Sequence, residues 1–495
     1  MRVDWRKEVK MLTPKKISQM STFVGRKFEW ARLSNIGNSL DPCILVVYGR
    51  RRIGKTELLE QVYADRNILK FEGLYGKSQK DQIAHVLWQL SEYAGNPLLA
   101  KLSFSSWTEV FKCIYDQIPE GIWTLYFEEI QWLADYQDDF VSELKFAWDN
   151  YFKNKQGLLL ILCGSSPSFI LNQVIHSKSL YNRSQHELHL GEFSLSETAQ
   201  YLPTRSKREV LDAYLTIGGI PEYLKRCKTV SSVFLSLSEN TFLPDSFFSK
   251  EYERIFVSSL ATNKHYKSII EFLALRRFAS REEILKHLKI STSGSLTDIL
   301  KDMELCGFVC KYTPYNLGES SHLARFCISD NYLQFYYKFI KPISSDIQKG
   351  SYKSNPISAI KFDVYQKWLG FAFERFCRNK HRLIAKILGF NGIHYSAGAF
   401  FNKASQEVES GFQIDLIFDR DDKVITMCEI KYTQAKIGVE VIEEFERKVR
   451  LFSNKKNKTI QKILISAEGA SDTLESRHYF DRVITIEELF AAEEP

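Results

Sequence analysis

The fold of the first part of this chain is indicated by the stretch Gly49-Arg50-Arg51-Arg52-Ile53-Gly54-Lys55-Thr56. It matches the phosphate-binding loop G-x-x-x-x-G-K-[ST]. The apolar run Ile44-Leu45-Val46-Val47 before it predicts a buried strand, and residues 57–63 after it have helical periodicity. A chance match on an Arg-rich turn is the alternative, but it does not account for the strand and the helix. The sequence therefore predicts that the chain binds a nucleoside triphosphate.

Each part of this loop has a predicted role in holding ATP and Mg²⁺. Glycines let successive backbone N–H groups of residues 49–54 turn inward around phosphate oxygens, and the helix N-terminus adds its positive end. Lys55 is expected to reach the β- and γ-phosphates, and the hydroxyl of Thr56 is expected to ligate Mg²⁺.

Length and composition place limits on the rest of the chain. With 495 residues it is too long for one core, so several domains are expected. A net charge of +7 permits contact with nucleic acid. No run of eighteen apolar residues predicts a membrane span, and the first residues lack the apolar core of a secretion signal. The nine scattered cysteines form no CxxC pair, which favours free thiols in a reducing cytoplasm.

A pair of acids follows the predicted strand Trp123-Thr124-Leu125-Tyr126-Phe127. An acid at the end of such a strand holds the Mg²⁺ water shell, and a second acid polarises the attacking water as general base. We assign the first role to Glu128 and the second to Glu129. The usual pair is Asp-Glu, and the extra methylene of Glu128 moves its carboxylate. Despite this departure we favour hydrolysis, and the alternative is a slow ATPase that works as a nucleotide-gated switch.

Further strands are predicted at residues 67–72 and 158–163, with a helix between them at about 80–93. Ser165 follows the second of these strands and is expected to contact the γ-phosphate or the attacking water. A plain helix N-cap ahead of Pro167 is the alternative role of this serine region. Strands flanked by helices, with the phosphate loop after the first strand, predict a parallel α/β sheet.

Three short boxes resemble those of archaeal-type ATPases of the AAA+ (STAND-related) group. They are the F-x-G-R-x-x-E box at Phe23–Glu29, the Y-x-R box at Tyr181–Ser184 and the G-G-x-P box at Gly218–Tyr223. The resemblance implies that Gly25 and Arg26 lie on the adenine side of the pocket. It also makes Arg183 a candidate arginine finger, acting in cis or from a neighbouring subunit of a homo-oligomer. A solvated surface charge is the alternative for Arg183.

The middle of the chain is predicted to be helical. Residues 202–262 show helices without recognisable chemistry, and three helices at 266–273, 280–288 and 293–305 precede a strand at 307–312. That order is typical of a winged helix, a helix-turn-helix variant. Contact with DNA and a spacer between domains both remain open, because the third helix region is polar but weakly charged: Ser291, Thr292, Ser293, Ser295, Thr297 and Lys301. The aromatic helix at 332–339 is expected to pack in a core.

A second cluster of chemical groups appears in the last third of the chain. A helix at 365–377 carries Glu374 inside an apolar stripe, and a strand at 413–418 carries Asp415. After a turn at Asp421-Asp422, the return strand places Glu429 and Lys431 on one face by its two-residue alternation. An antiparallel hairpin brings that face against Asp415. Burying these charges is costly unless they meet an ion or a substrate.

These residues resemble the D-(x)n-E-x-K constellation of the PD-(D/E)xK nuclease-like fold. The resemblance implies that Asp415 and Glu429 ligate Mg²⁺ and that Lys431 orients or deprotonates the attacking water. Glu374 is similar to the extra helix-borne acid of Holliday-junction-resolvase-like members. The family's proline is absent, because Ile414 stands before Asp415. The alternative is a decayed nuclease kept as a nucleic-acid-binding or dimerisation module.

The expected fold is an α/β multidomain protein. Its domains are predicted at 1–200 (P-loop ATPase with a parallel sheet), 201–262 (helical lid), 263–345 (winged helix) and 346–495 (a restriction-endonuclease-like α/β domain). The predicted function is an ATP-hydrolysing cytoplasmic protein that acts on nucleic acid, preferably DNA, with a Mg²⁺-dependent nuclease. The alternative is a nucleotide-gated signalling or defence switch that binds without cutting. A helicase function lacks support, because the sequence shows no further helicase motifs.

Overall fold

The computed structural model describes residues 23–137, 139–176, 183–228, 231–258, 265–276, 278–290, 293–312, 315, 325–402 and 411–492. The chain forms two compact units. The first contains Met1–Tyr48, Lys55–Gly164 and Phe169–His189, and the second contains Gly49–Gly54, Ser165–Ser168 and Leu190–Pro495. Tyr181 and Asn182 of the Y-x-R box, and the polar residues Ser291 and Thr292, lie outside the described residues. Among the described helices, none is long and apolar enough to cross a membrane.

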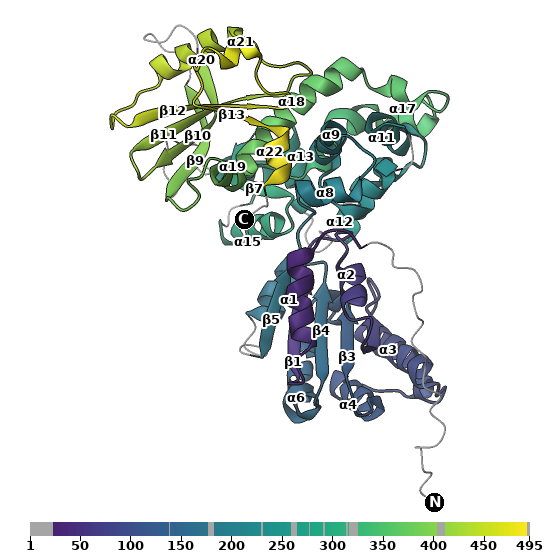
Figure 1. Ribbon diagram of the computed structural model, residues 1–495. Helices are drawn as coiled ribbons and strands as arrows, with labels where there is room; N and C mark the ends of the chain where they lie inside the picture. Colours follow the sequence, from purple (N-terminus) through teal and green to yellow (C-terminus); the bar gives the residue numbers. More distant parts are fainter. Residues whose placement is uncertain are drawn as a thin grey trace, which may run out of the picture. The chain divides into compact units, whose positions relative to one another are not determined.

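A parallel five-stranded sheet in the order β2-β3-β4-β1-β5 forms the centre of the first unit (Figure 1). Its strands are β1 (Cys43–Tyr48), β2 (Asn67–Glu72), β3 (Trp123–Glu128), β4 (Leu158–Gly164) and β5 (Ser184–His189). The first four were expected because their apolar runs are typical of buried parallel strands. The parallel sheet is therefore confirmed. The polar sequence of β5 carries no such run, so this edge strand escaped prediction.

Helices connect these strands. They are α1 (Lys27–Gly37), α2 (Lys55–Val62), α3 (Gln79–Ala94), α4 (Trp107–Gln117), α5 (Ile130–Leu133), α6 (Asp139–Asn150) and, after β4, α7 (Pro167–Phe169). The predicted helix at 80–93 is confirmed by α3. A core of aromatic rings joins helices to the sheet, since Phe111 of α4 and Phe140 of α6 both meet Phe127 of β3 edge-to-face.

The second unit begins with helices, as predicted. They are α8 (Leu195–Tyr201), α9 (Lys207–Ile217), α10 (Pro221–Leu224), α11 (Val233–Phe242) and α12 (Phe247–Ser258). Three more helices follow: α13 (His265–Ala274), α14 (Arg281–Leu288) and α15 (Ser293–Leu305). An antiparallel sheet in the order β6-β8-β7 accompanies them, formed by β6 (Ala279–Ser280), β7 (Val309–Tyr312) and β8 (Arg325–Ile328). The three predicted helices are confirmed, and a capping box of Ser280 and Glu283 begins α14.

The C-terminal part contains a mixed sheet in the order β13-β12-β11-β10-β9 (Figure 1). Its strands are β9 (Tyr395–Asn402), β10 (Phe412–Arg420), β11 (Val424–Lys431), β12 (Thr459–Ser466) and β13 (Arg482–Thr485). The first three pair antiparallel and the last three pair parallel. The predicted hairpin is β10–β11. The surrounding helices are α18 (Phe362–Asn379), α19 (His381–Ile387), α20 (Glu440–Leu451), α21 (Asp472–Glu475) and α22 (Ile486–Ala491).

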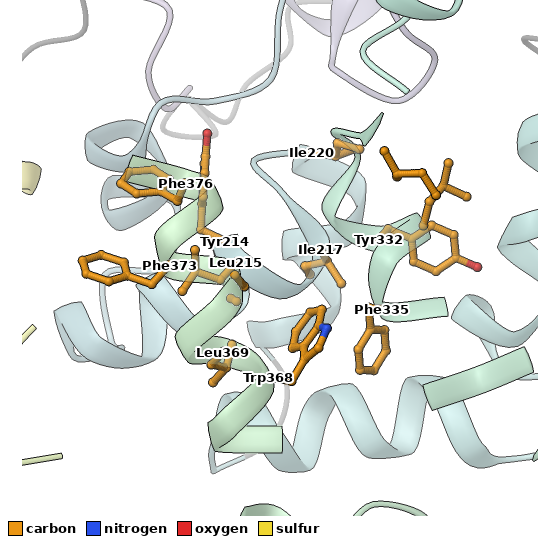
Figure 2. Packing of buried hydrophobic residues seen from close by; sticks show 14 of the residues in the cluster. Tyr214, Leu215, Ile217, Ile220, Tyr332, Phe335, Trp368, Leu369, Phe373 and Phe376 are labelled. Carbon is orange, nitrogen blue, oxygen red and sulfur yellow. The ribbon is translucent and has the colours of Figure 1, made fainter. Parts of the chain in front are cut away.

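A large hydrophobic core in the second unit extends from Phe193 to Phe490, and two smaller clusters lie in the C-terminal part. Figure 2 shows side chains of α9, of α16 (Asn331–Phe335) and of α18 meeting in it. The Thr216 and Tyr365 hydroxyls, 2.7 Å apart, form a buried hydrogen bond between α9 and α18. Tyr332 and Phe335 are buried, which confirms the expected core role of the aromatic helix. The later parts of the chain therefore share a core, and the predicted boundaries at residues 262 and 345 fall within it and stay predictions.

Candidate functional site

The loop between β1 and α2 has a backbone that favours its glycines. Gly49 has φ 150° and Gly54 has φ 88°, and a Cβ on Gly49 would lie 2.2 Å from the carbonyl oxygen of Leu190. Arg52 also has positive φ, 71°, a left-handed conformation that is uncommon for a residue with a side chain. Such conformations cost free energy and cluster at binding sites. The loop conformation therefore suits Gly49 and Gly54 but is locally unfavourable for Arg52.

Thr56 and Glu128, two of the predicted Mg²⁺-side residues, lie together in the first unit. The Thr56 hydroxyl, in the first turn of α2, donates a hydrogen bond to Oε1 of Glu128 at the end of β3. Nζ of Lys70, on the neighbouring strand β2, lies 2.6 Å from Oε2 of the same carboxylate. The Thr56 hydroxyl and the Glu128 carboxylate are oxygen ligands of the kind that Mg²⁺ prefers. They could hold this ion together, because Mg²⁺ takes few protein ligands and keeps several waters.

Lys70 was missed by the sequence analysis. It lies in β2 and also pairs with Glu60, 2.9 Å away. Burial acts to lower the pKa of Lys70, but hydrogen bonds and charge from Glu128 and Glu60 outweigh it and raise this pKa. The lysine thus stays charged and compensates Glu128. The sequence did contain an indication of this role, because Lys70 is a charged residue within a predicted buried strand.

The other predicted ATPase residues lie near strand ends or in the N-terminal box. Lys55, the first residue of α2, is buried. Glu129 follows β3 with φ 51° and accepts a hydrogen bond from Nε2 of Gln131 at 2.6 Å. Arg26 is buried, with Nη1 3.4 Å from Glu29. Ser165 is fully buried directly after β4, in the second unit. The catalytic and adenine-side roles of these residues stay predictions.

Arg183 forms a two-pronged ion pair with Asp149. Its Nε and Nη2 each lie 3.0 Å from one oxygen of that carboxylate. The hydrogen bond from Arg183 lowers the pKa of Asp149. Both side chains are about one-third exposed, at 31% and 28%. This geometry favours the alternative of a solvated surface pair, and the arginine-finger role stays a prediction.

The arginines of the phosphate loop have acidic partners within the second unit. Arg50 pairs with the buried Asp330, and its guanidinium lies 4.7 Å from the ring centre of Phe308. Nη1 of Arg52 lies 2.6 Å from Oε2 of Glu251, which is 2% exposed. The guanidinium groups of Arg50 and Arg52 are thus paired with these two carboxylates. These partners are 280 and 199 positions away in the sequence, so no local pattern predicts either pairing.

The predicted C-terminal residues converge on one pocket of about 400 Å³. Strands β10 and β11 and helices α18 and α20 provide its walls. The lining includes the four predicted residues Glu374, Asp415, Glu429 and Lys431, together with Phe371, Gln413, Tyr432, Glu444, Arg447 and Lys448. The hairpin register explains the convergence, because Leu416 pairs with Cys428 and the neighbouring positions along each strand point to the opposite face. The expected convergence of the two acids and the lysine is confirmed.

Asp415 is buried beside other acids. Its Oδ2 accepts a hydrogen bond from the backbone N–H of Ile430 at 3.1 Å, and its Oδ1 accepts one from Gln413 at 3.0 Å. Burial, followed by the charges of Glu429 and Glu374, raises the pKa of Asp415 from 3.8 to about 7, although Lys448 opposes the shift. Asp415 therefore exchanges its proton near neutral pH and gains from a cation that favours the carboxylate.

Glu429 is 1% exposed and meets two lysines. Nζ of Lys431 lies 2.9 Å from its Oε1, while Nζ of Lys448 lies 3.0 and 2.8 Å from its two oxygens. Burial acts to lower the pKa of Lys431, but Glu429 outweighs it and raises this pKa. Lys448 was missed by the sequence analysis. Its signal is a lysine on the buried stripe of α20 that also contains Val441 and Phe445.

Glu374 lies at the edge of this group. Nη1 of Arg378, one turn along α18, lies 3.5 Å from Oε2 of Glu374 and 3.4 Å from the backbone carbonyl oxygen of Asp415. Within the described residues, no three His, Cys, Asp or Glu side chains form a group that could hold a metal ion. Asp415 and Glu429 nevertheless fit Mg²⁺, which is commonly bound by one or two carboxylates plus waters and substrate phosphates.

A comparison with protein families finds a similarity in the N-terminal part. Residues 23–227 match a family model described as an ATPase domain predominantly from Archaea. An uncharacterized protein of Methanocaldococcus jannaschii, MJECL04, is 27% identical over 416 residues, which cover 84% of this chain and 88% of that protein. The match to the family model supports a P-loop ATPase domain in residues 23–227. It does not extend to the pocket around Asp415.

Solved structures resemble the chain more distantly. The Walker-type ATPase paby2304 of Pyrococcus abyssi is 17% identical, with a TM-score of 0.45, and the match covers 64% of this chain and 96% of that one. The ORC2 protein of Aeropyrum pernix, solved as ADPNP-ADP complexes, is 13% identical, with a TM-score of 0.43, and the match covers 66% of this chain and 95% of that one.

Proposed function

We propose that this protein is an ATP-hydrolysing enzyme that acts on nucleic acid and carries a Mg²⁺-dependent nuclease site in its C-terminal part. The observation that carries the proposal is the pocket in which Asp415, Glu429 and Lys431 meet. Asp415 and Glu429 are buried, and an apolar side chain would fill such a sheet position at lower cost. Buried charged groups at these positions favour chemistry on a charged ligand.

The ATPase part of the proposal rests on Thr56 and Glu128. Their hydrogen bond places a hydroxyl and a carboxylate together where Mg²⁺ would be held beside the nucleotide phosphates. Lys55 would carry positive charge to the phosphates, and Glu129, the next acid along the chain, would polarise the attacking water. Mg²⁺, when bound, would neutralise the developing charge on the phosphates.

Nucleotide binding is tested with Lys55→Ala, and Lys77→Ala serves as the matched control because Lys77 is an exposed lysine of the same unit. Affinity for a fluorescent ATP analogue with Mg²⁺ should be lost in the first variant and kept in the second. Glu129→Gln should preserve binding and slow hydrolysis by about 10²-fold, the size of a general-base contribution. If Glu128→Gln slows turnover and Glu129→Gln does not, the two roles are reversed.

In the nuclease site, Asp415 and Glu429 would hold Mg²⁺, which supplies Lewis-acid stabilisation of a phosphodiester under attack. Lys431 lies 2.9 Å from Glu429, so its ammonium is placed to orient a water beside the same group. Gln413 holds the Asp415 carboxylate through a hydrogen bond of 3.0 Å. The helices α13, α14 and α15 with sheet β6-β8-β7 have the order of a winged helix, which we propose as an arm that contacts DNA.

The nuclease proposal is tested by comparing Asp415→Ala, Lys431→Ala and the control Lys436→Ala, which removes an exposed lysine just beyond β11. Supercoiled and branched DNA are incubated with each protein and Mg²⁺, with and without ATP. Cleavage should be lost in both site variants. Calorimetric Mg²⁺ affinity should fall only in Asp415→Ala, because Lys431 is not a ligand. Wild-type protein that neither binds Mg²⁺ nor cleaves any DNA or RNA contradicts the proposal.

A second candidate function is a nucleotide-gated switch whose C-terminal part binds nucleic acid without cutting it. The observation that favours it is the double contact of Lys448 with Glu429, at 3.0 and 2.8 Å. Lys431 contacts the same carboxylate, so the two lysines already compensate the charge of Glu429 without a metal ion. ATP-dependent DNA binding without cleavage, in the same assays, supports this function.

A further inference from the structure

Two cysteines face each other in the small antiparallel sheet of the second unit. Cys310 of β7 is paired directly with Cys327 of β8 in the strand register. Their sulfur atoms lie 3.3 Å apart. The other described cysteines are also free thiols. Cys310 and Cys327 are both half-buried, so each residue is partly exposed to solvent, unlike the fully buried cysteines.

The backbone at this position suits a covalent bond between the two sulfurs. Directly opposed residues of an antiparallel pair have Cα atoms about 4.5 to 5.5 Å apart. Disulfides form across Cα separations of roughly 4.4 to 6.8 Å. The two thiols therefore need only a change of side-chain rotamer, and no movement of β7 or β8, to come within bonding distance.

The surroundings of Cys327 favour its reactive form. Arg375 of α18 has two buried guanidinium nitrogens, Nε and Nη2, without a hydrogen-bond partner among the described residues. Burial, followed by the charge of Arg378, lowers the pKa of Arg375 to about 10. A hydrogen bond from Cys310 lowers the pKa of Cys327, and Arg378 and Arg375 act in the same direction against burial. The thiolate is the nucleophile in thiol–disulfide exchange, so Cys327 is the thiol that attacks first.

We propose that Cys310 and Cys327 are a redox-modification site that converts reversibly between a dithiol and a disulfide. The oxidant is a low-molecular-weight disulfide such as oxidised glutathione. The Cys327 thiolate attacks one sulfur of the oxidant, whose S–S bond breaks and releases one glutathione thiolate, which takes a proton. The Cys310 thiolate then attacks the sulfur of Cys327 and expels the second glutathione, which takes the second proton. The protein loses two electrons, and the oxidant gains them.

The test uses the full chain in graded ratios of reduced to oxidised glutathione, followed by alkylation and peptide mass spectrometry. We expect one linked peptide pair that contains Cys310 and Cys327, lighter by two hydrogen atoms than the separate peptides, and full recovery of both thiols after reduction. Cys113→Ser is the matched control, because Cys113 is also half-buried but lies in α4 of the first unit. The Cys113→Ser variant should form the same linked pair as the wild type. The Cys310→Ser variant should instead trap Cys327 as a mixed disulfide with glutathione.

Three further results decide the proposal. Arg375→Gln should slow the first step at neutral pH without changing which cysteines become linked, because it removes positive charge beside the Cys327 sulfur. Recovery of Cys310 and Cys327 as separate peptides under all ratios overturns the proposal. Linkage of either cysteine to the neighbouring Cys306 to the same extent overturns it as well. Circular dichroism of each variant under reducing conditions shows that it is folded.

Discussion

Asp415→Asn is expected to change how the stability of the second unit depends on pH. In the folded protein the pKa of Asp415 is about 7, against an ordinary value of 3.8. The unfolded chain therefore gives up this proton first as the pH rises, and the folded form binds more protons between these two values. Stability then falls as pH rises through this window. Asparagine carries no proton to lose, so the variant lacks this loss of stability.

The magnitude follows from the shift. A rise from 3.8 to about 7 is roughly 3 units, and at about 1.36 kcal/mol per unit the destabilisation reaches about 4 kcal/mol above pH 7. This value is a ceiling, because Lys431 and Lys448 can rearrange toward an ionised Asp415 and water can enter the pocket. Asp415→Asn should equal the wild type near pH 4 and exceed it by up to about 4 kcal/mol at pH 8.

Hydrogen exchange of the β10 and β11 amides without Mg²⁺ measures this effect, because it reports on the hairpin even if the two units unfold separately. Asp421→Asn is the control, since Asp421 is a 73%-exposed carboxylate in the turn of the same hairpin. Mg²⁺ should restore stability in the wild type at pH 8 but not in Asp415→Asn. Equal pH dependence of Asp415→Asn and wild type would refute the assigned shift, as would a difference that grows toward low pH.

Two further predictions concern the ion pairs of Glu429 and Glu251. Lys448→Met leaves Lys431 as the one lysine beside Glu429, which is 1% exposed, and should lower the free energy of unfolding by about 3–5 kcal/mol. Urea unfolding measures this loss, and adding Glu429→Gln to the variant should recover much of it. No recovery would contradict the pairing of Lys448 with Glu429. Arg52→Ala and Glu251→Gln should show a coupling free energy of about 1–3 kcal/mol in a double-mutant cycle on stability. Additive effects of the two changes would mean that the 2.6 Å contact contributes nothing.

Much of the site was predictable because its signals are local. The order of strand, glycine-rich loop and helix around Lys55 and Thr56 lies within 20 residues, and each element has its own hydrophobic period. The convergence of Asp415 with Glu429 and Lys431 follows from a short hairpin, whose turn and two-residue alternation set which side chains share a face. Charged residues inside otherwise apolar strands then indicate a site rather than a core.

The partners of the buried charged residues became known from the tertiary structure, because they come from different elements of the fold. Lys448 comes from a helix that follows the hairpin, and its place beside Glu429 depends on how α20 packs against the sheet. Arg50 and Asp330 are 280 positions apart, so no window of sequence contains their pairing. Cys310 and Cys327 are only 17 positions apart, but their sulfur contact depends on the register of two short strands. Local periodicity determines which elements form and which face is buried, whereas the partner of a buried charge is set by which elements pack together, because only packing removes the competing water.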